Sequence, residues 1–156
     1  MDTLVGIASA HTLVRIPTAA ATEFIDITDR IQSLVSACDV SVGIVNLQSL
    51  HTTTAIVVNE HEPLLLADFE ATLDNAASAG ARYCHDDALM RTVNLTPGER
   101  PNGHAHCRAL LLGVSASLNI VDGRLLLGRW QRVFFVELDG PRERVISVVV
   151  LGEPRS

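Results

Sequence analysis

The sequence predicts one α+β domain over residues 1–156, built on a mixed, largely antiparallel β-sandwich with two or three helices. Strand-like segments outnumber helical ones, and the two kinds do not alternate as they would in a doubly wound sheet. A chain of 156 residues that is 47 % hydrophobic can also bury one core. Because aromatic residues make up only 4 % of the chain, that core must be aliphatic.

The first elements are two strands and a short helix. Strand-type residues cover 2–16, where Pro17 ends the run, and polar and apolar residues alternate over 23–27. Thr28-Asp29 offers a helix N-cap, and apolar residues follow at helical spacing. We therefore predict an amphipathic helix over 29–38.

Two strand-like segments then follow each other closely, at 41–50 and 55–58. Strands average about five to six residues, so one straight strand over both segments is implausible. We predict a bend near 49–52, which places His51 at the end of a strand.

The middle of the chain contains the clearest helix. Pro63 suits its first turn and Gly80 can stop it. Its apolar stripe predicts packing against the core. The stripe consists of Leu66, Phe69, Leu73 and Ala76. Residues 82–103 resemble a long loop, which in compact domains is often functional or mobile, and 104–112 can form a short helix closed by Gly113.

Strands return at the C-terminal end. Segments 117–121 and 124–127 predict a hairpin around the Asp122-Gly123 turn. Two further strands are expected at 130–138 and 144–151. Apolar residues occupy both faces of the last strand, so another subunit could cover one of them.

Composition and charge narrow the classes of function. The formal charge of −6 argues against a general nucleic-acid binder, although late basic residues leave room for a locally positive pocket. These are Arg124, Arg129, Arg132, Arg142 and Arg144. Three widely spaced cysteines without a Cys-x-x-Cys motif suit a reducing compartment. With no basic leader and no apolar run near the roughly eighteen residues of a membrane span, we expect a cytoplasmic protein without a membrane partner.

Three of the six histidines lie at the edges of predicted elements or in the long loop. They are His51, His85 and His106. Neutral imidazoles suit zinc, and three with an open fourth position form a catalytic type of site. Because three neutral ligands do not offset the positive charge of the metal, such a site would attract anionic groups such as phosphate. The spacing of these histidines matches no local metal-binding signature.

The remaining polar candidates have alternative interpretations. His104 is interpreted as a solvated residue at a helix start, and His11 and His61 as surface residues. Glu60 and Asp86 could orient a metal-bound imidazole or transfer a proton. Equally, Glu60 could supply charge to a helix N-terminus and Asp86 could cap a loop.

A series of short motifs stands in order along the chain. The series is His51-Thr-Thr-Thr-Ala, Asn59-Glu60, Tyr83-x-His85-Asp86, Ala105-His106-x-Arg108, Leu112-Gly113, Asp122-Gly123-Arg124-Leu125, Gly128-x-Trp130-Gln131, Pro141-Arg142 and Gly152-Glu153. This set resembles the YjbQ family, often described as secondary thiamine-phosphate synthase enzymes. The resemblance covers roughly residues 20–153.

The resemblance implies a YjbQ-like fold, a homotrimer and a metal- or anion-binding cluster at the three matching histidines. The implied activity joins hydroxymethylpyrimidine diphosphate to thiazole phosphate, so the partner would be a small phosphorylated substrate. The implied cofactor is a divalent metal, either zinc, which imidazoles favour, or magnesium, which could arrive with the diphosphate. The alternatives are a non-catalytic trimer that binds metal or a phosphate ligand, and a metal-dependent phosphate-ester hydrolase.

The matching positions, together with Arg129, supply the other candidate roles. The catalytic candidates are Glu60, Asp86 and Arg108. The substrate-binding candidates are Thr52, Thr53, Asn59, Arg129, Trp130 and Gln131. Arg129 and Arg132 depart from the family pattern and could either strengthen phosphate binding or block the usual substrate.

Overall fold

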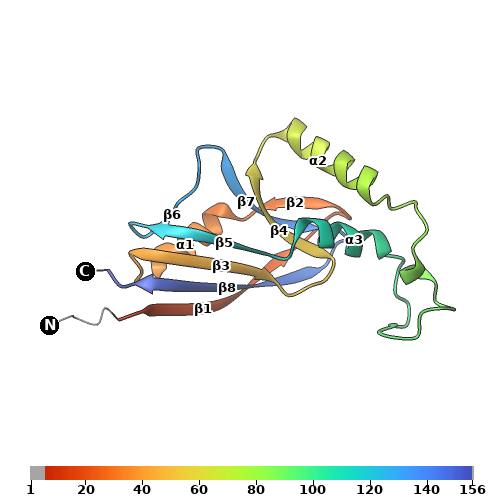
Figure 1. Ribbon diagram of the computed structural model, residues 1–156, viewed down its shortest axis with the longest axis horizontal. Coiled ribbons are helices and arrows are strands. Elements are labelled where there is room, and N and C mark those ends of the chain that lie inside the picture. The colour runs from red at the N-terminus through yellow and green to blue at the C-terminus, as the bar shows by residue number, and fades with distance from the viewer. Residues whose placement is uncertain (1–5, 156) are drawn as a thin grey trace.

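The computed structural model describes residues 6–155 and consists of two facing β-sheets with two helices on the far side of the smaller sheet (Figure 1). Sheet A has the strand order β1-β8-β3-β5-β6, and sheet B has the order β2-β7-β4. Sheet A consists of β1 (Ala8–Pro17), β3 (Val42–Ser49), β5 (Ser115–Val121), β6 (Arg124–Leu125) and β8 (Glu143–Glu153). Sheet B consists of β2 (Glu23–Asp26), β4 (Thr54–Glu60) and β7 (Gln131–Glu137). The pairings are antiparallel, and the predicted α+β class is confirmed.

The main core lies between the two sheets and is closed by α1 (Thr28–Ala37). Alternate residues of each strand point into it, as the two-residue period of a strand requires. Its members include Val14, Ile16, Ile31, Val35, Val45, Leu47, Ile56, Phe135, Ile146 and Val148. The layer is almost wholly aliphatic, as the composition predicts.

A second core lies on the other face of sheet B, beneath α2 (Pro63–Ala76) and α3 (Gly103–Leu112). It joins Ala55, Phe134, Val136 and Leu138 to Leu73, Ala105 and Ala109. Strand β7 is covered on both faces, so successive residues from Val133 to Val136 are all apolar and buried. A strand covered on one face only would instead alternate polar and apolar residues.

Residues 50–53 carry the chain from sheet A to sheet B, because β3 ends in one sheet and β4 begins in the other. The predicted bend is therefore confirmed, and its cause is a change of sheet. A hydrogen bond between Ser49 Oγ and Thr54 Oγ1 closes the turn, and the Ser49 hydroxyl also accepts the N–H of His51. This places His51 at the boundary between the sheets.

Three predictions about helices need correction. The N-cap of α1 is Ile27, one residue before the predicted cap, because Asp26 Oδ1 already accepts the N–H of Thr28. Helix α2 ends at Ala76, before Gly80. Of its predicted apolar stripe Leu73 is buried, Leu66 and Phe69 are half-buried, and Ala76 is exposed, so the stripe packs against the second core over only part of its length.

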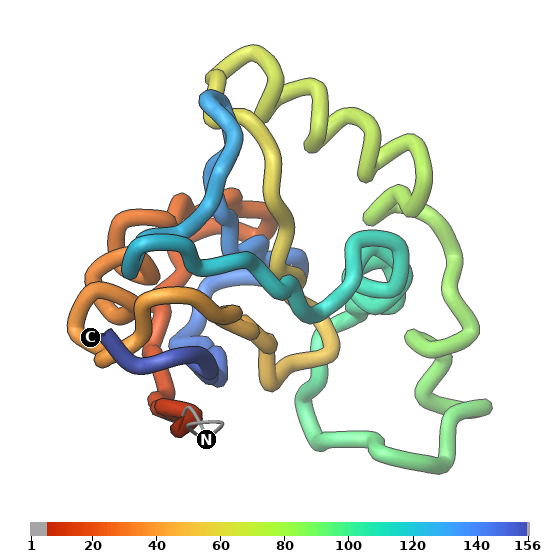
Figure 2. The backbone as a smooth tube through the Cα atoms, turned by 60° about the vertical axis from the view of Figure 1, so that its left-hand side comes forward, coloured from red at the N-terminus to blue at the C-terminus, as the bar shows by residue number. Residues whose placement is uncertain are grey.

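The predicted loop over 82–103 contains a 3₁₀ turn, η1 (Cys84–Asp86). Figure 2 shows this segment leaving the end of α2, running away from the sheets and returning to the start of α3. The part of the first predicted strand at residues 2–5 lies outside the described residues. No helix among residues 6–155 combines the length and apolar composition that a membrane span requires.

Candidate functional site

A cleft of about 470 Å³ lies where the 50–53 crossing, the long loop, the start of α3 and the start of β8 meet. It brings together five of the predicted site residues: His51, Thr52, Thr53, His85 and His106. The other lining residues are Leu50, Arg91, Asn94, Glu99, Asn102, Asp139, Arg142 and Arg144. Segments about 90 residues apart in sequence therefore contribute to one site.

His85 and His106 are in direct contact, with ring centroids 4.5 Å apart and ring planes inclined by 62°. His85 Nε2 is buried and has no hydrogen-bond partner, which is rare for a buried polar atom. Burial lowers the pKa of His106, and the neighbouring His85 lowers it further. His106 is therefore neutral at pH 7, the form that binds a metal.

His51 is held differently. The backbone N–H of Val145 donates to His51 Nε2 over 2.9 Å, which assigns the ring proton to Nδ1 in the neutral imidazole. Burial lowers the pKa of His51, and the charge of Arg144 adds to this effect. In this conformation His51 offers the cleft a hydrogen-bond donor, whereas its role as a third metal ligand stays a prediction.

Asp86 holds the two histidine-bearing elements together. One of its oxygens, Oδ1, accepts the backbone N–H groups of Asn102 and Gly103, each over 2.9 Å, at the N-terminus of α3. A Cβ at Gly103 would lie 2.4 Å from the Cβ of Tyr83, so the close contact between η1 and α3 requires glycine. Of its two sequence interpretations, the structure favours the cap.

A buried ion pair forms the floor of the cleft. Arg144 and Glu137 are 3 % and 0 % exposed, and Arg144 Nε lies 2.6 Å from Glu137 Oε2. Arg144 also donates to Thr53 Oγ1, which ties β8 to the crossing between the sheets. Burial raises the pKa of Glu137, but the Arg144 hydrogen bond and backbone N–H donors outweigh this effect and lower it.

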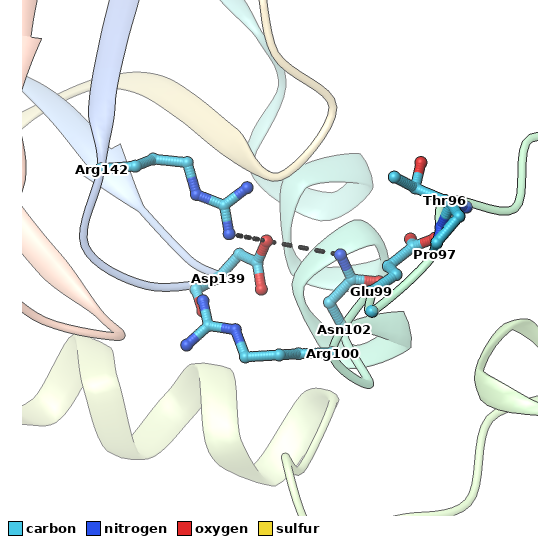
Figure 3. A pocket seen from close by; sticks show the side chains of 8 residues that line it. Thr96, Pro97, Glu99, Arg100, Asn102, Asp139 and Arg142 are labelled. Carbon is cyan, nitrogen blue, oxygen red and sulfur yellow. Dashed lines mark hydrogen bonds and ion pairs between the residues drawn. The ribbon is translucent and has the colours of Figure 1, made fainter.

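A second pair lies at the rim, beside an adjoining cavity of about 330 Å³. Figure 3 shows the Asp139 carboxylate between Arg142 and Asn102. Asp139 Oδ2 accepts from Arg142 over 2.7 Å and from Asn102 Nδ2 over 3.3 Å. Asn102 Oδ1 is buried without a partner, so the two such side-chain atoms within residues 6–155 both belong to residues of the cleft.

The third pair joins Arg91 to Glu99 over 3.1 Å within the long loop. The Arg91 hydrogen bond lowers the pKa of Glu99, so this carboxylate is ionised. Each of the three arginines of the cleft is thus paired with one carboxylate. Since the imidazoles of His51 and His106 are neutral at pH 7, the cleft gains no large excess of positive charge from its own side chains.

Several predicted residues lie elsewhere. Asn59 and Glu60 end β4, five and six residues from Thr54 at the cleft end of the strand, or about 17–20 Å. Glu60 is paired across the sheet with Gln131, whose side chain accepts the N–H of Gly128.

Arg129 stacks on the exposed Trp130, with its guanidinium carbon 4.5 Å from the ring centroid. The structure gathers these five predicted residues at the far end of sheet B, away from the cleft and its histidines His51, His85 and His106.

Arg108 is also separate from the cleft. Its side chain is 6 % exposed and donates to the carbonyl of Ala77 and to Asp74, each over 2.9 Å. It therefore joins α2 to α3. The structure does not support the predicted catalytic role for Arg108 within this chain.

The remaining histidines have ordinary partners. His11 is exposed and lies 3.1 Å from the Ser147 hydroxyl, and His61 is exposed and lies 3.0 Å from Asp26. Both are surface residues, as predicted. His104 is half-buried beside Tyr83, so its predicted solvated position is wrong.

Arg132 is occupied by carboxylates outside the cleft, because it bonds Asp26 over 2.7 Å and Asp29 over 3.1 Å. Burial opposes the ionisation of Asp26, but hydrogen bonds, led by that of Arg132, lower its pKa from 3.8 to about 2. The two predicted effects of Arg132, on phosphate binding and on the usual substrate, stay predictions.

The lowered pKa of Asp26 predicts a pH-dependent contribution to stability. The pKa of Asp26 is lower in the folded protein than in the unfolded chain. The ionised carboxylate therefore stabilises the fold above about pH 4, and this stabilisation is lost as the pH falls from about 4 to about 2. The shift corresponds to about 2 kcal/mol. Urea unfolding should therefore show Asp26→Asn to be less stable than the parent at pH 5, with a smaller difference at pH 2. A constant difference would contradict this account.

Sequence reasoning missed Arg91, Asn94, Glu99, Asn102 and Asp139 as residues of the cleft. It noticed Arg142 and Arg144 only as part of a basic cluster. The sequence feature that could have indicated these residues is the long loop, which carries several charged and amide residues between His85 and His106. Within residues 6–155, no three His, Cys, Asp or Glu side chains form a ready-made metal cage.

The fold and the cleft define a small α+β protein with a histidine-lined site. Residues 12–153 match the family described as UPF0047 protein YjbQ-like, and the chain belongs to this family. It is 39 % identical over 137 residues to a UPF0047 protein of Methanothermobacter thermautotrophicus, which covers 88 % of each chain. It is 29 % identical to the UPF0047 protein YugU of Bacillus subtilis, over 89 % of this chain and 97 % of that one.

Solved structures agree with the fold. A YbjQ-like protein of unknown function from Sulfolobus solfataricus P2 has a TM-score of 0.84 at 33 % identity, covering 95 % of this chain and 100 % of that one. A hypothetical protein from Aeropyrum pernix K1 has a TM-score of 0.80 at 32 % identity, covering 92 % and 99 %.

These comparisons correct the predicted activity. The relatives are named as UPF0047 proteins and not as thiamine-phosphate synthases, and the Sulfolobus solfataricus protein is described as being of unknown function. The expectation of thiamine-phosphate synthase activity is therefore wrong, while the family itself is confirmed.

Proposed function

We propose that the cleft binds a divalent transition-metal ion at His85 and His106 and, through this ion, a small phosphorylated ligand. The observation that carries the proposal is the buried, unpaired His85 Nε2 beside the ring of His106. An unpaired buried nitrogen costs free energy in the folded protein. Binding a cation would satisfy it.

The donor set favours zinc over magnesium. Imidazole nitrogens are typical zinc ligands, whereas magnesium takes oxygen ligands and retains several waters. Burial keeps His106 neutral at pH 7 and therefore ready to bind. Because two imidazoles fill only two positions of a four-coordinate zinc ion, they leave positions open for a ligand.

The charges of the cleft explain why an anion would follow the metal. Each arginine is offset by a carboxylate before metal binds, whereas a divalent ion on neutral imidazoles adds two positive charges. A bound ion would act as a Lewis acid toward a phosphoryl oxygen. Arg142, with its side chain 45 % exposed, and the Nδ1–H of His51 offer donors to the same anion. A cleft of about 470 Å³ suits a small molecule.

This function predicts that phosphate binding depends on metal. Protein stripped with a chelator should bind phenyl phosphate at least about tenfold more weakly than the zinc-loaded protein by calorimetry, because the excess positive charge is missing. Arg142→Ala should weaken phenyl phosphate binding in the loaded protein while its zinc affinity stays unchanged. Equal phenyl phosphate affinity with and without zinc would contradict the proposal.

We further propose that the protein acts as a homotrimer in the cytoplasm. The outer face of sheet A carries exposed apolar residues, among them Leu13, Ile44 and Leu151, which a neighbouring subunit would cover. All three cysteines are free, which suits a reducing compartment. Light scattering should give about three times the chain mass of 16.8 kDa, and the monomer mass would refute the trimer.

A further inference from the structure

The long loop returns to the cleft at Glu99 and places a carboxylate beside the histidine pair. Glu99 Oε1 lies 3.9 Å from His85 Nε2, the buried nitrogen that lacks a partner. The side chain of Glu99 is 21 % exposed, so it belongs to the wall of the cleft and not to the open surface. The Glu99 carboxylate of the loop therefore lies near the His85 ring of η1, which in turn contacts the His106 ring of α3.

The separation of these two atoms is close to that of two ligands on one metal ion. Zinc binds imidazole nitrogen and carboxylate oxygen at about 2.0–2.2 Å, which places neighbouring donors about 3.4 Å apart in a tetrahedron. The observed 3.9 Å is longer by a few tenths of an ångström. A small movement of the loop would close this gap, whereas direct hydrogen bonding requires a much shorter approach.

Arg91 controls the position of this carboxylate. It donates to Glu99 Oε1 over 3.1 Å and also to the backbone carbonyls of His85, Val93 and Asn94. One guanidinium thus links the backbone beside His85 to the oxygen that faces the His85 ring. Glu99 Oε2 is bonded separately by the N–H of Thr96, so Oε1 is the oxygen free to exchange partners.

We propose that Glu99 is a metal ligand, which leaves Arg91 when the ion binds and completes a site with His85 and His106. This inference rests on the proposed function. Two imidazoles and one carboxylate form a recognised zinc donor set that keeps a position open for a ligand. The carboxylate offsets half of the charge of the ion, and the released Arg91 becomes available to a phosphorylated ligand.

The experiment measures zinc affinity and the cobalt(II) absorption spectrum of the chelator-treated protein and of four variants, one of which, His85→Ala, removes a proposed histidine ligand. Glu99→Gln should weaken zinc binding by about 10- to 100-fold and change the cobalt(II) visible spectrum, because an anionic ligand is lost. Arg91→Met should keep the spectrum of the parent and bind zinc at least as tightly, because Glu99 then has no ion pair to break when the ion binds. Glu143→Gln, which removes an exposed carboxylate paired with Arg15, is the matched control and should also behave as the parent.

The outcomes separate this inference from the function on which it rests. Unchanged zinc binding in Glu99→Gln, with loss in His85→Ala, overturns the role of Glu99 and leaves the histidine site standing. Equal losses in Glu99→Gln and Arg91→Met with unaltered cobalt spectra also overturn it, because they assign Glu99 to loop structure. Zinc binding that survives in both Glu99→Gln and His85→Ala refutes the proposed function itself.

Discussion

Replacing Arg144 by methionine is expected to lower the free energy of unfolding by about 3–5 kcal/mol. The change leaves the Glu137 carboxylate buried without its cation, at a position with no exposed area. Glu137 Oε1 also accepts the N–H groups of Leu138, Asp139 and Gly140, so the carboxylate cannot move to solvent without breaking that turn. The loss should therefore approach the full cost of an unpaired buried charge.

Urea unfolding at pH 7 would measure the effect, with Arg15→Met as the matched control. Arg15 pairs with Glu143 on the neighbouring strand, but its side chain is 73 % exposed, so its loss should cost less than about 1 kcal/mol. The double variant Arg144→Met, Glu137→Leu should recover only part of the stability, because three backbone N–H groups lose their acceptor. Equal effects of Arg15→Met and Arg144→Met would contradict the account of the buried pair.

Replacing either His85 or His106 by alanine is expected to weaken zinc binding by about 100-fold or more. Each variant removes one of the two imidazoles that are in contact. In metal sites, loss of a residue that only hydrogen-bonds a ligand already lowers metal affinity by about 10- to 100-fold, so loss of a ligand should cost more. Competition with a chromophoric chelator would measure the affinity. The fold should persist, since neither histidine belongs to the buried apolar cores.

His11→Ala is the matched control for these variants, because His11 is exposed on the outer face of sheet A. Its zinc affinity should equal that of the parent. A loss of similar size in all three variants would assign zinc to adventitious surface histidines, which would refute the histidine pair as the centre.

Much of the fold could be predicted from the sequence because its signals are local. Pro63 begins α2, Gly113 ends α3 with a φ of 86°, and Asp122-Gly123 turns the hairpin with both φ angles positive. The bend before β4 followed from strand length alone. The arrangement of strands into two sheets required pairings such as Ala8 with Gly152, which no local pattern contains.

The candidate site was only partly predictable. The histidines stand out by residue type, yet which of them meet depends on the cap that Asp86 places on α3. Family motifs suggested Asn59 and Trp130, but a strand of seven residues carries its two ends far apart. The arginine partners were missed because each pair joins residues that are unremarkable when considered singly, as Arg91 and Glu99 illustrate.

Anomalous diffraction at the zinc edge, from crystals grown with equimolar zinc, would show whether His85 and His106 form a metal centre. We expect one strong peak per chain within bonding distance of His85 Nε2 and a ring nitrogen of His106. A peak confined to other residues, or no peak at this pair in protein shown to be folded, would contradict it.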